Sequence, residues 1–485
     1  MSSAAQLEAR DTSVPETLVS RLACPACTSS ELRPATDDGQ LECTRCNARY
    51  PLYTSGPASI PWVYRDPEST LLEWKTRFNG FLHSNWAEQS RLRKALKSKS
   101  LSKLARSRLE LLLEARMTQR IQVSELLSPL DLECVNFDRG HDPASLLRSR
   151  LPGSQGVSSY YNNVFRDWSW NNGENEQQLE AVQQILAEAG VDELSDVLTI
   201  GAGACRLAYD LHAALQPQFS AALDVNPLLL FLASRVIGGE TLSMVEFPTA
   251  PLNDTSFAVQ QECRAPNPLS DGDFAYLFAD GLNPPLTDAC FDAVVTPWLI
   301  DIIPQNLKDF ALTVNRVLDT GGIWINTGSL AFFHKDPTWC YSEAEVLALA
   351  EHCGFEILAT ERRQLPYLQS PHSAYWRTEN VLTFCARKIE VVEETRHFRY
   401  LPEWMVDSGC AVPSRPEFSV CSSDHLLRAQ ILAAIDGQRS IDDIATSLAR
   451  EYGLRQLEAK NAVHRIILEV YETHVVQQED LIDSM

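Results

Sequence analysis

The 485-residue chain contains no run of about 18 apolar residues, the length that a membrane-spanning helix requires. Its first residues, MSSAAQLEAR, also lack the charged stretch followed by an apolar stretch that marks a secretory signal. These two absences argue against an integral membrane protein of the helical kind and against a secreted one. We therefore expect a soluble, cytoplasmic protein with no membrane partner.

Basic residues are scarce, since 42 Lys and Arg stand against 64 Asp and Glu and give a formal net charge of −22. Nucleic-acid binding takes much of its affinity from Lys and Arg, so we assign no nucleic-acid partner. Eight basic residues do lie between Arg91 and Arg108. They form either a solvated helix face or a surface that attracts an acidic partner.

Most of the 13 cysteines are scattered, which argues against a disulfide framework, but four of them follow a pattern. Cys24 and Cys27 form one Cys-x-x-Cys pair, and Cys43 and Cys46 form a second pair, with fifteen residues between the two pairs. This spacing is typical of a zinc ribbon, and four thiolates fill the tetrahedral coordination of zinc. The sequence predicts a structural zinc within residues 1–65, with two disulfides or reactive thiols as the alternatives.

The pattern of apolar residues divides the remaining chain. Residues 66–150 have helical spacing and predict two or three long helices, whereas strands and helices alternate over residues 151–388. That alternation predicts a doubly wound α/β domain with a mostly parallel sheet. Residues 389–420 form a linker, and residues 421–485 contain three helical segments with an N-capping SIDD. The predicted strands are DVLTIGAG, SAALDV, FAYLFADGL, FDAVVTPWLI, GGIWINTG and ENVLTFCARK.

The first predicted strand leads into a glycine turn, GAGACR, at residues 201–206. Gly201 and Gly203 would allow a nucleotide to approach the backbone, but Arg206 occupies the position of the third glycine in a dinucleotide fingerprint. Asp224 and Asp280 each end a predicted strand, where they suit the ribose hydroxyls and the adenine amino group of a nucleoside. This combination favours S-adenosylmethionine, which carries no phosphate; alternatively, the two carboxylates only cap turns.

Five stretches resemble carnosine N-methyltransferase and its relatives, and they occur in the family's order over about residues 66–388. They are EWKTRFNGF, FRDWSW, GAGACRLAYDL, DAVVTPWLIDIIPQNLKDF and LDTGGIWINTGSL. The resemblance implies a Rossmann-like S-adenosylmethionine-dependent methyltransferase domain. It implies transfer of a methyl group to an imidazole nitrogen of a histidine-containing small molecule, dipeptide or peptide. A methyltransferase of another substrate class and a non-catalytic adaptor remain alternatives.

The resemblance and the residue pattern together assign roles to individual residues. Asp301 would hold the imidazole, and His334, one place later than in the family pattern, would act beside it. The residues on the substrate side would be Trp298, Tyr367 and Tyr375. The residues that contact the cofactor would be Asn163, Arg166, Gly201, Gly203, Arg206, Asp224 and Asp280. Asp301 could instead be the N-cap of the helix that contains PQNLKDF, and His334 an ordinary surface or packing histidine.

Two departures from the family pattern bear on the cofactor site. Cys205 stands where the family has a glycine, so either the turn keeps ordinary backbone angles or the cofactor lies differently. Asn163 replaces a longer glutamine. Loss of the glycine is also the best support for a non-catalytic adaptor.

Two further segments resemble known small modules. Residues 1–65 are similar to the zinc ribbons found beside some methyltransferases, and residues 421–485 resemble the PqqD-like winged-helix module that holds leader peptides. The second likeness implies peptide binding, with a dimerisation or stabilising domain as the alternative. The expected architecture is thus an α/β methyltransferase domain with an N-terminal zinc ribbon, a helical region and a C-terminal winged-helix-like domain.

Overall fold

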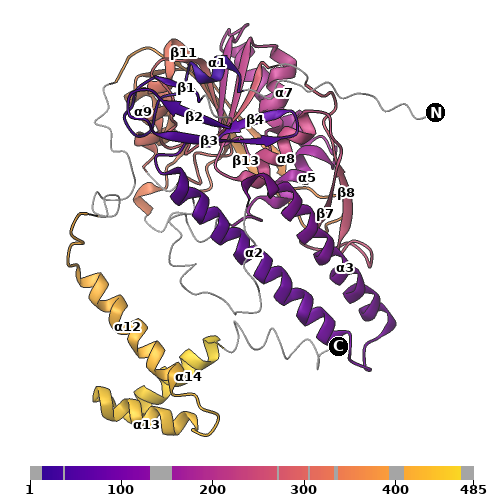
Figure 1. Cartoon of the computed structure of the whole chain (residues 1–485), viewed down its shortest axis with the longest axis vertical. Helices are drawn as coiled ribbons and strands as arrows, with labels where there is room; N and C mark the ends of the chain where they lie inside the picture. Colours follow the sequence, from indigo (N-terminus) through magenta and orange to yellow (C-terminus); the bar gives the residue numbers. More distant parts are fainter. Residues whose placement is uncertain are drawn as a thin grey trace. The chain divides into compact units, whose positions relative to one another are not determined.

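The computed structural model describes residues 14–35, 39–131, 156–269, 272–303, 306–332, 337–392 and 409–470 (Figure 1). The described residues of 1–89 and 111–400 form one compact unit, and those of 90–110 and 401–485 form a second. No helix in the described part of the chain combines the length and the apolar character that crossing a bilayer demands.

The first unit is built on a seven-stranded sheet with the order β12-β13-β11-β10-β5-β6-β9. The five strands from β11 to β9 are parallel, whereas β13 and β12 are antiparallel to their neighbours. The strands are β5 (Asp196–Ile200), β6 (Phe219–Asp224), β9 (Phe274–Phe278), β10 (Phe291–Pro297), β11 (Leu318–Ser329), β12 (Phe355–Tyr367) and β13 (Arg377–Lys388). The prediction of a mostly parallel α/β sheet is confirmed.

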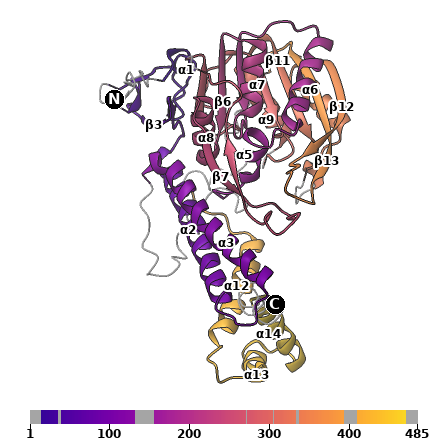
Figure 2. The ribbon, with the colours of Figure 1, turned by 90° about the vertical axis from the view of Figure 1, so that its right-hand side faces the viewer.

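Helices cover both faces of this sheet because successive strand residues point to opposite sides. Val197 packs with α6 and α7 on one face, and the next residue, Leu198, packs with α9 and α10 on the other. Helix α6 contacts β12 and β13. Both α6 and α7 are labelled in Figure 2. The helices of the domain are α5 (Tyr161–Trp168), α6 (Glu174–Glu188), α7 (Arg206–Leu215), α8 (Pro227–Ile237), α9 (Leu307–Val317), η3 (Pro337–Trp339) and α10 (Glu343–His352). A separate hairpin consists of β7 (Leu242–Glu246) and β8 (Val259–Cys263).

The N-terminal ribbon shares a core with this sheet. It contains α1 (Glu16–Val19), β1 (Leu32–Pro34), β2 (Gln40–Cys43), β3 (Arg49–Ser55) and β4 (Ala58–Pro61). Leu18 and Leu41 are fully buried in the same apolar cluster as Leu277 of β9. Directly after β4, Trp62 forms a parallel bridge with Phe278, whose carbonyl accepts a hydrogen bond of 3.0 Å from Val63 N. The segment that follows the ribbon therefore continues the sheet beyond β9.

Two long helices follow, as the sequence predicts: α2 (Pro67–Ala95) and α3 (Lys103–Leu126), with the short η1 (Ser128–Leu130) after them. They are linked side by side, since Asn85 Nδ2 donates to the Arg116 carbonyl at 3.0 Å. Trp74 and Phe78 of α2 are buried in the cluster that also contains Cys205 of the glycine turn. The beginning of α2 thus lies against the α/β domain.

The C-terminal segment consists of α12 (Pro416–Ala433), α13 (Ile441–Tyr452) and α14 (Gln456–Val470) around its own apolar cluster. Ser440 begins α13 with a capping box, because its side chain binds Asp443 N and the Asp443 side chain binds Ser440 N. Residues 409–470 contain no strand, and residues 471–485 lie outside the described part. The three predicted helices are confirmed, and the winged-helix likeness stays a prediction.

Candidate functional site

The glycine turn lies at the carboxyl end of β5 and is tied to β6 by Asp224. Gly201 and Gly203 have positive φ angles of 70° and 57°. A Cβ atom on Gly201 would lie 2.9 Å from Leu299 Cδ1, so only glycine fits there without a shift. Asp224 Oδ2 accepts a hydrogen bond of 2.7 Å from Gly203 N, and Oδ1 accepts one of 2.8 Å from Asn226 N. The carboxylate therefore fixes the turn.

Burial raises the pKa of Asp224 to about 6, although the N–H groups of Asn226 and Gly203 favour the charged form. Asp280 follows β9, the neighbour of β6, and its side chain is exposed. Its Oδ1 atom accepts a hydrogen bond of 3.0 Å from Leu282 N, so it does cap a turn. The two acids predicted to bind a nucleoside thus stand at the ends of adjacent strands.

Cys205 adopts the left-handed conformation, with φ 64° and ψ 16°, at the N-cap of α7. Of the two alternatives for this turn, the one with ordinary backbone angles is wrong. The left-handed region costs an L-residue roughly 1–2 kcal/mol, and the fully buried Cys205 side chain holds the position. The backbone therefore follows the path that a glycine would take.

Helix α5 is anchored to the glycine turn, because Trp168 Nε1 donates to the Ala204 carbonyl at 2.9 Å. Arg206 supports the same junction: its Nε atom binds Asp210 Oδ2 at 2.8 Å, and one terminal nitrogen donates to the Asp167 carbonyl at 2.7 Å. These donors already have protein acceptors, so the contacts favour a structural role for Arg206 over the predicted cofactor contact.

The two other predicted cofactor residues lie on α5. Arg166 is buried and its Nε atom donates to Asp167 Oδ1 at 2.7 Å. Its guanidinium carbon lies 5.8 Å from the ring centre of Tyr367. Asn163 is half-buried in the first turn of α5. Their placement beside the glycine turn is compatible with the predicted role.

Asp301 lies after β10, the strand next to β5 in the sheet. Its Oδ2 atom accepts hydrogen bonds from Ser329 Oγ at 3.1 Å and from Ala331 N at 3.3 Å. Burial raises the pKa of Asp301, and these two donors oppose the rise. The alternative role as a helix N-cap is wrong, because Asn306 caps α9 by accepting a hydrogen bond of 2.8 Å from Lys308 N.

An aromatic pair stands close to Asp301. The rings of Trp298 and Tyr367 are 4.8 Å apart at an angle of 62°, and the guanidinium carbon of Arg377 lies 4.4 Å from the centre of the Tyr367 ring. Trp298 has a φ of 48°, and its buried Nε1 atom has no hydrogen-bond partner among the described residues. A Cβ atom on Gly328 would lie 2.9 Å from Trp298 Cα, which explains the glycine that ends GGIWINTG.

No contact among the described residues joins the predicted substrate residue Tyr375 to this pair. The side chain of Tyr375 is 60% exposed, although a hydrogen bond of 2.9 Å from Ser373 Oγ to its carbonyl fixes the Tyr375 backbone. His334 lies outside the described residues. A cavity of about 440 Å³ is lined by Glu379 and by Ser329 and Ala331, the two residues that donate hydrogen bonds to Asp301.

Tyr160 is a candidate that the sequence reasoning missed. It precedes α5 with a positive φ of 59°. Burial raises its pKa, and the charges of Tyr367, Asp224 and Asp301 add to the rise. A tyrosine beside a helix start carries no signal in the sequence; only the fold shows which acids it approaches.

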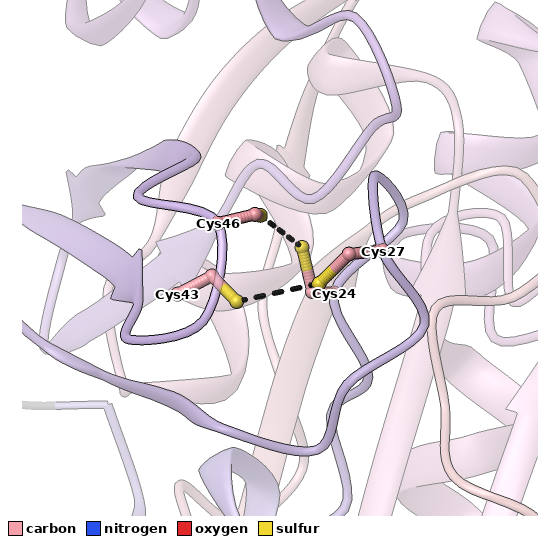
Figure 3. A group of neighbouring side chains, drawn as sticks. All are labelled: Cys24, Cys27, Cys43 and Cys46. Atoms are coloured by element: carbon pink, nitrogen blue, oxygen red, sulfur yellow. Dashed lines mark hydrogen bonds between the residues drawn. The ribbon is translucent and has the colours of Figure 1, made fainter.

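The four patterned cysteines converge on one point (Figure 3). Their Sγ atoms all lie within 4.8 Å of one another, with 3.6 Å between Cys24 and Cys46 and between Cys27 and Cys43. Tetrahedral zinc with Zn–S bonds of about 2.3 Å separates its sulfurs by about 3.8 Å. The four cysteines are free thiols rather than two disulfides. The cluster therefore fits a zinc ion.

Backbone turns aim these thiols at the centre. Thr28 N donates to the Cys24 carbonyl at 2.7 Å, and Asn47 N donates to the Cys43 carbonyl at 2.8 Å. Thr28 and Asn47 both have positive φ angles, of 60° and 59°. The two knuckles thus have the same local geometry, as a pair of Cys-x-x-Cys sequences predicts.

Comparison with known proteins agrees with this geometry. The family model for carnosine N-methyltransferase matches residues 149–390. The carnosine N-methyltransferase unmet of Drosophila melanogaster is 29% identical over 139 residues, which cover 28% of this chain and 30% of that protein. The chain thus matches less than a third of the length of this relative.

Solved structures of low similarity include a chain from Galdieria sulphuraria assigned as a sarcosine dimethylglycine methyltransferase. It is 14% identical, covers 48% of this chain and 98% of its own, and has a TM-score of 0.33. An S-adenosylmethionine-dependent methyltransferase from Thermotoga maritima is 16% identical, covers 47% of this chain and 93% of its own, and has a TM-score of 0.29. TM-scores below 0.5 establish no shared substrate. Through residues 149–390, the chain belongs to the carnosine N-methyltransferase family.

Proposed function

We propose that this protein transfers a methyl group from S-adenosylmethionine to an imidazole nitrogen of a histidine-containing small molecule, dipeptide or peptide. The observation that carries the proposal is the place of Asp301. This half-buried carboxylate follows β10, and Leu299, two residues before it, nearly touches the glycine turn at Gly201. An acid suited to binding an imidazole N–H thus stands next to the turn suited to binding the nucleoside.

The cofactor supplies an electrophilic methyl group on a positively charged sulfur. A neutral imidazole is already a nucleophile, so the protein mainly has to hold it in line with the C–S bond. Gly201, Gly203, Asp224 and Asp280 would hold the cofactor, which would supply its methyl group to the imidazole nitrogen and keep the C–S electron pair on sulfur, so that the ring would become positively charged. Asp301 accepts the N–H of the other ring nitrogen, which fixes the tautomer and stabilises that charge. The ring proton then leaves to Asp301 or to solvent.

The remaining roles follow from position. Gly201 and Gly203 present backbone to the nucleoside, Asp224 accepts from its ribose hydroxyls, and Asp280 accepts from its adenine amino group. Trp298 and Tyr367 shield the reacting nitrogen from water. Because Cys205 takes the glycine conformation, it no longer supports the alternative of a non-catalytic adaptor.

We further propose that the cysteine cluster holds one structural zinc and that the C-terminal helices bind the peptide flanking a target histidine. Four thiolates would leave no open coordination position, so this zinc would take no part in methyl transfer. The first part of the proposal is tested by metal analysis and the second by truncation.

The central experiment is methyl transfer from labelled S-adenosylmethionine to histidine, carnosine and histidine peptides, read by mass spectrometry. Asp301→Asn should bind S-adenosylmethionine normally and lose about a hundredfold in kcat, because removing one such electrostatic contact costs roughly 3 kcal/mol. Asp192→Asn is the matched control, since Asp192 is exposed and precedes the opposite end of β5. Full turnover by Asp301→Asn would remove Asp301 from the mechanism, and no transfer to any imidazole would refute the proposed substrate class.

A further inference from the structure

The hydroxyl of Tyr64 is a buried polar group with no hydrogen-bond partner among the described residues. A buried donor left unsatisfied costs about 1–3 kcal/mol, so native proteins nearly always give it a partner. Tyr64 lies just after the ribbon, three residues beyond the end of β4. A bound molecule at this place would supply the missing partner.

Strand register places Tyr64 beside the nucleoside acids. Trp62 pairs in parallel with Phe278, and Tyr64 and Asp280 each follow two residues later along the two neighbouring segments. The ring of Trp62 lies 5.2 Å from that of Phe278 and 4.9 Å from that of Tyr64. These contacts put the Tyr64 ring on the same side of the sheet edge as Phe278 and its neighbours.

The charges around Tyr64 agree with this placement. Burial raises its pKa well above the ordinary value, and the carboxylates of Asp280, Asp224 and Glu73 add to the rise in that order. The hydroxyl therefore stays protonated at neutral pH and can donate a hydrogen bond. Tyr64 also packs against the apolar cluster that includes Ala202 and Cys205 of the glycine turn.

We infer that Tyr64 is a nucleoside-binding residue whose hydroxyl bonds to the purine edge of the cofactor, next to Asp280. The inference rests on the proposed function, because it names a further contact of the same cofactor site. It makes the segment after the zinc ribbon part of that site. Both the ribbon and the α/β domain would then have to be folded before the nucleoside binds fully.

The test uses the full-length, zinc-loaded chain and two tyrosine variants. Tyr64→Phe should raise the Kd for S-adenosylmethionine and for adenosine by about 5- to 10-fold, the effect of losing one hydrogen bond. The thermal midpoint of the free protein should not fall, because the hydroxyl has no protein partner to lose. Tyr53→Phe is the control: Tyr53 contacts the same Trp62 at 5.7 Å, and burial alone raises its pKa. The Kd values and the thermal midpoint of Tyr53→Phe should equal those of the wild-type protein.

The outcomes separate the two proposals. Wild-type binding together with a Tyr64→Phe Kd within twofold of wild type would overturn the inference and leave the proposed function standing. No binding by the wild-type chain would overturn both. If Tyr64→Phe unfolds early, Tyr64→3-fluorotyrosine keeps the hydroxyl, and its fluorine signal should shift when S-adenosylmethionine is added. An unchanged signal would overturn the inference.

Discussion

Asp224 shows how single residues in this site combine stability with function. Its carboxylate is held by two backbone N–H groups, yet burial still raises its pKa to about 6. The folded state therefore binds a proton more readily than the unfolded chain does. The favourable contribution of protonated Asp224 to folding is complete below pH about 4 and is lost as the pH rises through about 6. At neutral pH, where Asp224 is charged, its burial therefore lowers the free energy of unfolding of the cofactor-free protein.

Cofactor binding should show the opposite pH dependence, because ribose hydroxyls donate to the charged carboxylate. We expect the affinity for S-adenosylmethionine to be constant above pH about 7 and to weaken by up to about tenfold per unit below the pKa of Asp224. Calorimetry between pH 5 and 8 measures this. Asp224→Asn should bind weakly with no inflection near pH 6; an equal inflection in that variant would assign the titration to another group.

The residues that could be predicted are those whose role is indicated by the residues next to them in the sequence. Gly201 and Gly203 follow a hydrophobic strand, and Asp224 ends the next one, so the pattern alone places them at one sheet edge. Tyr64 and Tyr160 could not be predicted in this way. Each approaches the acids only through tertiary contacts, and a lone tyrosine carries no periodic signal.

Among the elements, the ribbon departs most from what the sequence indicates. The cysteine spacing predicts a separate zinc module, but the buried Leu18 and Leu41 belong to the core of the α/β domain. The apolar residues at these two positions predict that the side chains are buried, but the sequence does not show against which part of the molecule they pack. Strand β12 could not be predicted for a related reason: its sequence, FEILATERRQLPY, carries four charged residues that interrupt the apolar pattern, as suits the edge of a sheet.

Zinc removal should consequently affect the cofactor site as well as the ribbon. We expect one zinc per chain by atomic emission. Chelation, or Cys43→Ser, should lower the thermal midpoint and weaken S-adenosylmethionine binding several-fold, because Trp62 and Val63 continue directly from the ribbon onto β9. Cys340→Ser, at an exposed cysteine outside the ribbon, is the control. Metal-free protein with unchanged affinity would show that the ribbon and the site are independent.

At the scale of the whole molecule, the C-terminal helices have a core of their own. Ile431, Leu448 and Val463 come from three different helices and are buried together. The sequence predicted these helices because their caps and periodicity are local. The sequence left peptide binding and a dimerisation or stabilising role open for this segment, in which several apolar side chains are exposed, among them Phe418, Leu426 and Leu457.

Deletion of residues 409–485 should therefore leave the KM for carnosine unchanged and raise the KM for a histidine peptide about tenfold, a loss of about 1.4 kcal/mol in binding. Steady-state kinetics on both substrates provides the measurement. If both KM values stay the same while light scattering shows a halved mass, the segment is a dimerisation domain. An equal rise for both substrates would indicate a general loss of stability.

The pairing of Trp62 and Val63 with β9 has one more consequence. Within residues 149–390, the stretch that matches the family model, β9 is the edge strand of the sheet, and an earlier part of the chain pairs with it at Phe278. A polypeptide restricted to residues 149–390 would leave backbone N–H and C=O groups unpaired at the outer edge of β9, and this edge could pair with a strand of another molecule. The residues that match the family model are therefore not the same set as the residues that must fold together in this protein.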